Sequence, residues 1–504
     1  MSDSATAAGG RMLPPQAPLV EAAALSARSL RGSGRSLVVF GVVAAFQVFL
    51  VTTHVHWRDE LQALLIAQDS RSLADLFANL RYEGHPALWY LVLRAASLLE
   101  RSPAALTIVQ AVVALATLSL LWRFAPFPLW MKAAAGASYF LMYEYGTIAR
   151  SYGLGVVLVF AFMAVRHRAV AWLILALMAN VALHFAALSG ILVILMILER
   201  RWSTAGATVW AAGIVAAAMT MMPASDAQPA LRLFPDQLAN LLLAVHSLSA
   251  TIVPVDLTRA VFIWNLPTSH LGGLAIGLAT LAIGWLALRA DQRLAALYGF
   301  AYMGFVLIFT TIYFGQARHA GLLFVLVLVL HWARCEAPGN ASPTRSNPAL
   351  TTWLALGAGC GLWAAGWALV SPVSSAREVA DWIAARGLGG AVWAAEPGLY
   401  GVEITGRFGV PTYNLDKECL NTFVRWTVSE AGIPLPELSA RLRTAASANG
   451  GRLHVLSYRD LSATPDLEVN LLTLIPRDRM LEHKYLYQVT VPLGGPATSL
   501  PRCP

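Results

Sequence analysis

Long apolar runs, separated by short basic clusters, recur along most of this chain. The runs are roughly 16–22 residues long, which is the length that an α-helix needs to cross a bilayer. Clear examples lie at about residues 36–53, 103–121, 204–222, 271–289, 294–313, 317–333 and 350–371. The pattern predicts a polytopic, all-α membrane protein.

Basic clusters set the predicted orientation of these spans. Because Arg and Lys favour the cytoplasmic side, we expect the clusters at 166–168, 199–201, 289–293 and 334–345 to lie inside. Both ends of the stretch 169–198 are then cytoplasmic, which predicts a tight hairpin turning near His184–Gly190. Parity gives about 11 transmembrane helices, with a cytoplasmic N-terminus and an external C-terminus.

Three further stretches are better explained as interfacial helices. Residues 61–80 carry leucines at helical spacing with charged residues between them, and residues 86–100 begin with Pro86, which is tolerated at a helix start. We place both in the first external loop. Segment 238–255 is apolar, but its polar residues and the parity of the spans favour an interfacial helix in a later external loop.

The two ends of the chain differ from this pattern. Residues 1–35 are rich in Ala, Ser, Gly and Arg and predict a disordered cytoplasmic tail, ahead of a transmembrane catalytic domain over 36–373. From about 374 the composition changes. Predicted helices at 375–386 and 436–446 alternate with predicted strands at 390–395, 453–458 and 484–491. We expect a small extracytoplasmic α/β domain over 374–504.

Composition agrees with membrane embedding. The chain is 57% hydrophobic and 13% charged, with a mean hydropathy of +0.59, whereas a soluble domain carries about 25% charged residues. The net charge of +8 does not indicate nucleic acid as a partner, because the Arg residues lie at span ends. Four cysteines are too few for a disulfide framework. Cys419 and Cys503 share the C-terminal region, and either a disulfide or two free thiols fits.

Acidic residues follow the first predicted span. Asp59 and Glu60 could cap the start of the next helix. Their place just outside a span favours catalysis instead, with one carboxylate as a general base. Glu83 and His85 follow closely in sequence. They are either loop polar groups, groups that orient an acceptor, or, with the Asp, ligands of a possible divalent metal ion.

Basic and aromatic residues are expected at the same outer face. Arg150, close to Tyr152, is either a snorkelling side chain, an ion-pair partner of Glu144 or a partner for a lipid phosphate. Arg318 and His319 begin a later span, where two potential cations oppose the helix dipole unless an anion lies nearby. His184 contacts either a neighbouring helix or the substrate.

Taken in order, these segments resemble the GT-C glycosyltransferases. The motifs are Asp59-Glu60, a Gly-His-Pro-x-Leu-Trp-Tyr segment at 84–90, an Ala-Arg-x-Tyr segment at 149–152 and a His-Phe pair at 184–185. The similarity covers roughly residues 36–330. The nearest patterns are those of the family 39 protein O-mannosyltransferases and the bacterial lipid A sugar transferases.

The resemblance implies a polyprenyl-phosphate sugar donor and an inverting transfer. Asp59 matches the catalytic Asp and Glu60 the adjoining acid, while Glu83 and His85 match the second acidic motif. Arg150 matches an Arg that an Asp accompanies in several relatives. Here only Glu144 is near, which weakens a metal-binding role for that loop. Among the further substrate-binding candidates, Arg318 matches the residue that holds the carrier's phosphate; the others are Tyr152, His184 and His319.

We therefore expect an inner-membrane glycosyltransferase. It moves a sugar from a polyprenyl-phosphate donor to a hydroxyl of a lipid, glycan or protein acceptor at the outer face, with Asp59 as general base. The alternative is a transporter or flippase of lipid-linked sugars. Such proteins often carry internal repeats with matching broken helices, and the sequence shows neither.

Overall fold

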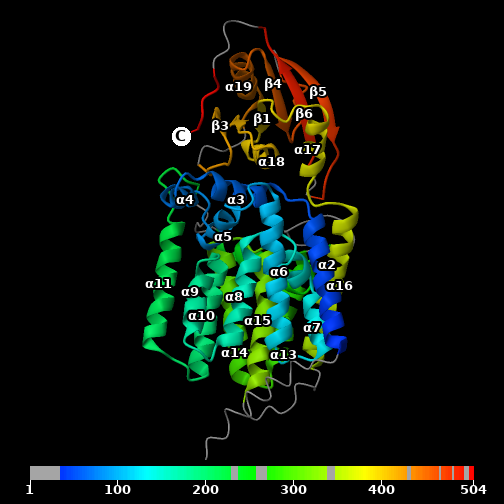
Figure 1. Cartoon of the computed structure of the whole chain (residues 1–504). Helices are drawn as coiled ribbons and strands as arrows, with labels where there is room; N and C mark the ends of the chain where they lie inside the picture. The colour runs from blue at the N-terminus through cyan, green and yellow to red at the C-terminus, as the bar shows by residue number, and fades with distance from the viewer. Residues whose placement is uncertain are drawn as a thin grey trace, which may run out of the picture.

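The computed structural model describes residues 34–228, 236–256, 270–337, 347–427, 433–464, 467–479, 482–492 and 499–503. The predicted tail over 1–35 lies outside these ranges, except for its last two residues. The described chain is mostly helical, and a small sheet domain stands on one end of a helix bundle (Figure 1). This arrangement agrees with the expected combination of an all-α membrane part and a C-terminal α/β domain.

Seven of the described helices are long and apolar enough to cross a membrane: α2 (Gly34–Thr53), α6 (Ala104–Phe124), α11 (Thr204–Met221), α13 (His270–Leu288), α14 (Gln292–Thr311), α15 (Ala317–Glu336) and α16 (Pro348–Val370). Each coincides with one of the predicted runs, so a multi-pass membrane protein is confirmed. Shorter apolar helices lie beside them: α8 (Ser151–Val165), α9 (Val170–Ala179) and α10 (Leu183–Leu198). The total of 11 spans and their orientation stay predictions.

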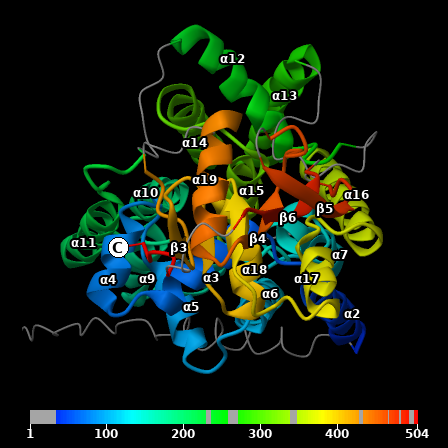
Figure 2. The ribbon, with the colours of Figure 1, turned by 90° about the horizontal axis from the view of Figure 1, so that it is seen from above.

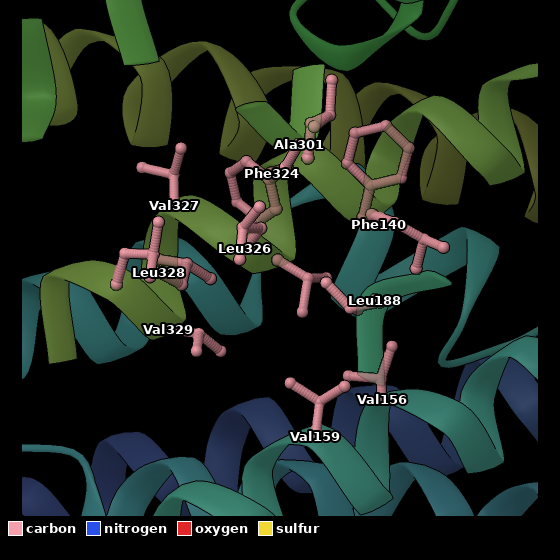
Figure 3. Close-up of a cluster of buried hydrophobic side chains, with 14 of the residues drawn as sticks. Phe140, Val156, Val159, Leu188, Ala301, Phe324, Leu326, Val327, Leu328 and Val329 are labelled. Atoms are coloured by element: carbon pink, nitrogen blue, oxygen red, sulfur yellow. The ribbon is translucent and has the colours of Figure 1, made fainter. Parts of the chain in front are cut away.

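Helix α15 is the centre of the bundle. Every residue from 317 to 333 is buried, whereas α2 and α11 expose most of their apolar surface, as lipid-facing helices do. Figure 3 shows α15 side chains Phe324 and Leu326–Val329 grouped with Val156 and Val159 of α8 and Leu188 of α10. The first turn of α15, which carries Arg318, is therefore held rigidly.

The predicted hairpin forms, but its turn lies a few residues earlier than expected. Helix α9 ends at Ala179 and α10 begins at Leu183, so His184 lies in the first turn of α10 rather than in the loop. Asn180 explains the early stop, because its amide donates to the carbonyls of Ala176 and Gly213, both at 2.9 Å. Side chains that bond backbone groups locally favour helix ends.

Two interruptions break the helical pattern before α8. Helix α7 (Leu129–Gly136) is followed by a short π-helix, η1 (Tyr139–Glu144), and by an irregular turn over 145–150. Gly146 fits this turn because a Cβ there would lie 2.2 Å from the carbonyl oxygen of Leu141. The turn delivers Ala149 and Arg150 to the end of the bundle that faces the sheet domain.

Three short helices separate the bundle from the sheet domain (Figure 1). They are α3 (Arg58–Asp69), α4 (Leu73–Leu80) and α5 (Leu88–Ser97). The single amphipathic helix expected over 61–80 is thus two helices, because Ser72 caps a new start by accepting from the N–H of Asp75 at 3.1 Å. The later segment 238–255 is helical as α12 (Gln237–Ser247) and η2 (Leu248–Thr251), packed on α13 and α14.

The sheet domain is a mixed six-stranded sheet in the order β3-β2-β1-β4-β6-β5. Strand β1 pairs in parallel with β2 and β4, and the other pairs are antiparallel. The strands are β1 (Trp393–Glu396), β2 (Thr412–Asn414), β3 (Cys419–Asn421), β4 (Arg452–Ser457), β5 (Glu468–Ile475) and β6 (Lys484–Thr490). Helices α17 (Ala376–Ala385) and α18 (Gly401–Phe408) pack on one face and α19 (Leu435–Ala448) on the other.

The sequence predicted two of these helices and three of these strands, and it missed α18, β2, β3 and β5. The 3₁₀ turn η3 (Gly398–Tyr400) leads into α18. Cys419 and Cys503 form a disulfide, which resolves the pairing that the sequence left open. Seen from above (Figure 2), the sheet domain covers the middle of the bundle, and α2, α11 and α12 lie at its edge.

The sheet domain rests on α3. Arg58 donates to Tyr400 Oη at 2.8 Å and to Glu482 at 2.7 Å, and Gln62 exchanges two hydrogen bonds with the backbone of Val424. Val402 of α18 joins the apolar cluster of α3. These contacts fix the first turn of α3 between the two parts of the molecule.

Candidate active site

A cavity of about 220 Å³ lies where the short helices, the bundle and the sheet domain meet. Five of the predicted site residues line it: Asp59, Glu83, His85, Arg150 and Arg318. They come from α3, the α4–α5 loop, the start of α8 and the start of α15. The chain thus brings two acids, a histidine and two guanidinium groups together from positions up to 259 residues apart (318 − 59).

Asp59 and Arg150 form an ion pair within this cavity. Arg150 Nη1 donates to Asp59 Oδ2 at 2.8 Å, and Asp59 keeps 30% of its side chain exposed. Oδ1 of Asp59 lies 3.7 Å from Nε of Arg58. Glu144, which the sequence offered as another partner for Arg150, instead accepts a hydrogen bond from Tyr139. The pair orients the carboxylate of Asp59, which lines the cavity.

Glu83 and His85 flank Gly84, whose φ of 67° suits a glycine. Glu83 accepts a hydrogen bond from Gln62 at 2.9 Å and a longer one from Tyr90 at 3.4 Å. Burial, reinforced by the charge of Asp59, raises the pKa of Glu83 to about 7. Glu83 therefore changes charge near neutral pH, the range in which a carboxyl group exchanges protons most usefully.

The pKa of His85 shifts in the direction opposite to that of Glu83. Burial, with the charges of Arg150 and Arg318, lowers the pKa of His85 to about 3. The imidazole is neutral at physiological pH, so it offers the cavity one donor and one acceptor. The positive charge at the cavity wall comes from the two guanidinium groups.

Arg318 lines the cavity from the first turn of α15, and the remaining predicted residues lie one layer behind it. Tyr152 Oη lies 2.8 Å from His319 Nε2, and the ring of His319 stacks on that of His184 with centroids 4.1 Å apart. The Arg318 guanidinium lies 5.9 Å from the centroid of the Tyr152 ring. Tyr152, His184 and His319 support Arg318 rather than line the cavity.

Glu60 lies away from this cavity. Its side chain is 0% exposed, and it accepts hydrogen bonds from the N–H groups of Ala149 at 2.6 Å and Trp57 at 3.0 Å. Consecutive helical residues point about 100° apart, so Glu60, predicted as a second catalytic acid beside Asp59, does not line the cavity with it. Burial opposes ionisation of Glu60, but the imidazoles of His54 and His56 outweigh it, so its pKa lies below the ordinary value.

The cavity residues do not fit the possible divalent metal ion. Among the residues that the structure describes, one group of three His, Cys, Asp or Glu ligand atoms lies within 4.8 Å of one another, and it is His54, His56 and Glu60. Asp59, Glu83 and His85 do not gather in this way. Two guanidinium groups at the same wall would also repel a cation.

Seven of the twelve lining residues were not among the predicted site residues, and two of them, Gln62 and Trp426, connect the cavity to the sheet domain. Trp426 reaches the cavity from the sheet domain. Gln62 holds the same stretch of chain in place through its two hydrogen bonds with the backbone of Val424. Trp426 follows β3 in an irregular stretch 366 residues after Glu60 (426 − 60), so no local pattern signals the contact. The only sequence feature that pointed to this contact was that Trp426 belongs to the C-terminal domain, which we expected on the same side of the membrane as Asp59.

No family model matches the chain, and no curated protein or solved structure matches it. The resemblance to GT-C glycosyltransferases therefore rests on the motifs, and glycosyl transfer stays a prediction at this point.

Proposed function

We propose that this protein is a membrane glycosyltransferase of the GT-C type. It transfers a sugar from a polyprenyl-phosphate donor to an acceptor hydroxyl, with inversion at the anomeric carbon. The observation that supports the proposal most is the cavity itself. It combines a partly exposed carboxylate, Asp59, with two guanidinium groups, Arg150 and Arg318, at the junction of the bundle and the sheet domain.

Asp59 is the general base of the proposed reaction. The acceptor hydroxyl gives its proton to Asp59, and its oxygen attacks the anomeric carbon from the face opposite the phosphate. The bond between that carbon and the phosphate oxygen breaks, and the electron pair leaves with the polyprenyl phosphate. Arg150 holds the carboxylate in place. Glu83 and His85, in the same wall, orient the acceptor through hydrogen bonds.

Arg318 stabilises the leaving phosphate. Negative charge grows on the phosphate as the bond breaks, and a guanidinium already in position stabilises it without reorganisation. Arg318 lies in the first turn of α15, where the helix dipole also favours an anion. Guanidinium groups bind phosphate bidentately. The bound phosphate would also offset the repulsion between the Arg150 and Arg318 guanidinium groups.

The disulfide supports the proposed orientation. Disulfides persist in oxidising compartments, and Cys419–Cys503 lies in the sheet domain. We place this domain and the cavity at the outer face of the inner membrane, with the N-terminus in the cytoplasm. Seven long helices, three shorter ones and the broken α7–η1 segment together would make the predicted 11 spans. The acceptor is a lipid, glycan or protein that is reached from outside.

Asp59→Asn tests the proposal in proteoliposomes with a labelled polyprenyl-phosphate sugar. Loss of a general base lowers rates by about 10²–10⁴-fold, and the variant keeps the shape of the side chain. Asp69→Asn, at the far end of α3 beside Arg101, is the matched control and should transfer at the wild-type rate. Sugar transfer by Asp59→Asn at the wild-type rate would rule out Asp59 as the general base. Wild-type protein that moves the donor lipid across the bilayer without transferring sugar would instead favour a flippase.

A further inference from the structure

A second cavity lies on the other side of the first turn of α3. Its volume is about 190 Å³, and its lining includes His54, His56, Thr107, Glu403 and Arg407. Asp59 does not line it. Glu60 does not line it either, but its carboxylate contacts the imidazoles of His54 and His56, which do.

Three donor atoms in this wall have the spacing of metal ligands. His54 Nε2 lies 2.9 Å from Glu60 Oε2, and His56 Nδ1 lies 3.5 Å from Glu60 Oε1. All three residues offer ligand atoms within 4.8 Å of one another. Ligands about 2.0–2.2 Å from one ion lie roughly 3–3.5 Å apart in tetrahedral geometry. The two separations from Glu60 fall close to that range.

Two of the three ligands, His56 and Glu60, are also held from behind. His56 Nε2 lies 2.9 Å from Thr107 Oγ1, while its Nδ1 is buried and makes no hydrogen bond. The N–H groups of Ala149 and Trp57 each occupy one Glu60 oxygen, and a carboxylate oxygen has a second lone pair to offer. Outer partners of this kind fix the tautomer and direction of metal ligands. The side chains of the three ligands are at most 9% exposed.

We propose that His54, His56 and Glu60 bind one Zn²⁺-like divalent metal ion, with an open coordination position toward the second cavity. Two imidazoles and one carboxylate suit zinc and cobalt, whereas calcium and magnesium prefer oxygen ligands alone. The ion would tie the 54–57 segment to α3 and, through Ala149, to the turn before α8. Asp59 adjoins Glu60 in sequence, and Arg150 adjoins Ala149. The ion would therefore position the Asp59–Arg150 ion pair without touching the substrate.

Metal binding by the full-length protein in detergent tests this proposal. The protein is stripped with a chelator, its purification tag is removed, and Zn²⁺ or Co²⁺ alone is returned. We expect about one tightly held ion per chain, visible Co²⁺ bands of a four- or five-coordinate site, and a higher melting temperature with metal. His54→Ala and His56→Ala should abolish all three effects. His85→Ala, in the first cavity, should keep them.

Thr107→Val provides a variant that changes no ligand. It removes the partner of His56 Nε2 at nearly constant volume, so affinity should fall about 10–100-fold while the protein stays folded. The proposal is overturned if stripped wild-type protein takes up no metal, if His56→Ala or Thr107→Val binds metal as tightly as wild type, or if His85→Ala loses it. In those cases Glu60 and the imidazoles form a metal-free hydrogen-bonded network.

Discussion

Asp59 and Glu60 are neighbours in sequence, but the structure gives them opposite surroundings. Asp59 faces the first cavity with 30% of its side chain exposed and one close guanidinium partner. Glu60 is 0% exposed and is bonded by two backbone N–H groups and an imidazole. A rotation of about 100° between consecutive helical residues is enough to separate a partly exposed carboxylate from one that is fully buried and bonded on several sides.

The pKa values of the two glutamates in this region, Glu60 and Glu83, shift in opposite directions. Glu83 has neutral partners, Gln62 and Tyr90, so burial decides and its pKa rises to about 7. Glu60 is more completely buried, but it faces two imidazoles, which favour its ionised form and lower its pKa. Partners, rather than burial alone, determine the charge of a buried acid.

The largest expected effect on folding comes from Glu60→Ala. The substitution leaves the His54 imidazole and two backbone N–H groups without their acceptor, so the free energy of unfolding should fall by about 3–5 kcal/mol. Thermal or denaturant unfolding in detergent measures it, and Asp59→Ala should cost much less. Equal losses of stability from Glu60→Ala and Asp59→Ala would contradict the claim that Glu60 stabilises the fold more than Asp59 does.

Arg318→Ala should lower the rate of sugar transfer by about 10²–10³-fold, because a positioned donor to the developing charge is lost. Transfer from the labelled donor lipid in proteoliposomes measures it. Arg318→Lys keeps the charge but not the bidentate geometry, so it should recover part of the rate. A full rate in Arg318→Ala would contradict an anionic leaving group at this position.

Glu83→Gln should change the pH dependence. If ionised Glu83 orients the acceptor, the wild-type rate rises about tenfold through pH 7, and the variant lacks that rise. Stability shows the opposite sign: the raised pKa makes wild-type protein lose stability as pH rises from 4.5 to about 7, with no such loss in Glu83→Gln. Rate profiles and unfolding from pH 5 to 8 test both. Parallel profiles for the two proteins would show that Glu83 does not titrate there.

The smallest effect is expected at the far end of α3. Asp69 and Arg101 are 3.3 Å apart, and the arginine side chain is 68% exposed, so Arg101→Ala should change stability by less than about 1 kcal/mol. Unfolding measurements check this value. A loss as large as that of Glu60→Ala would show that position along α3, and not the bonding of each acid, sets the cost.

Much of this site could be predicted from sequence, because its motifs lie at the ends of apolar spans. The apolar runs that became α2, α8 and α15 indicate where Asp59, Arg150 and Arg318 emerge, and span ends on one face tend to meet. The direction of Glu60 could not be predicted, since it depends on α3 starting at Arg58. If α3 were shifted by one residue along the chain, Glu60 and not Asp59 would point toward the cavity.

The sheet domain was less predictable for a different reason. Strands β2 and β3 have three residues each, too few to show an alternating pattern. Strand β5 lies at the sheet edge and is largely exposed, so its hydrophobic signal is weak. The contact of Trp426 with the cavity depends on long-range packing of this domain on α3, which no local pattern records.

A structure of the wild-type protein with a polyprenyl-phosphate sugar bound tests the central claim most directly. The account predicts donor phosphate oxygens within hydrogen-bond distance of Arg318, roughly 3 Å, with the anomeric carbon facing the Asp59 carboxylate. Donor density elsewhere, with the first cavity empty of phosphate and sugar, would contradict it.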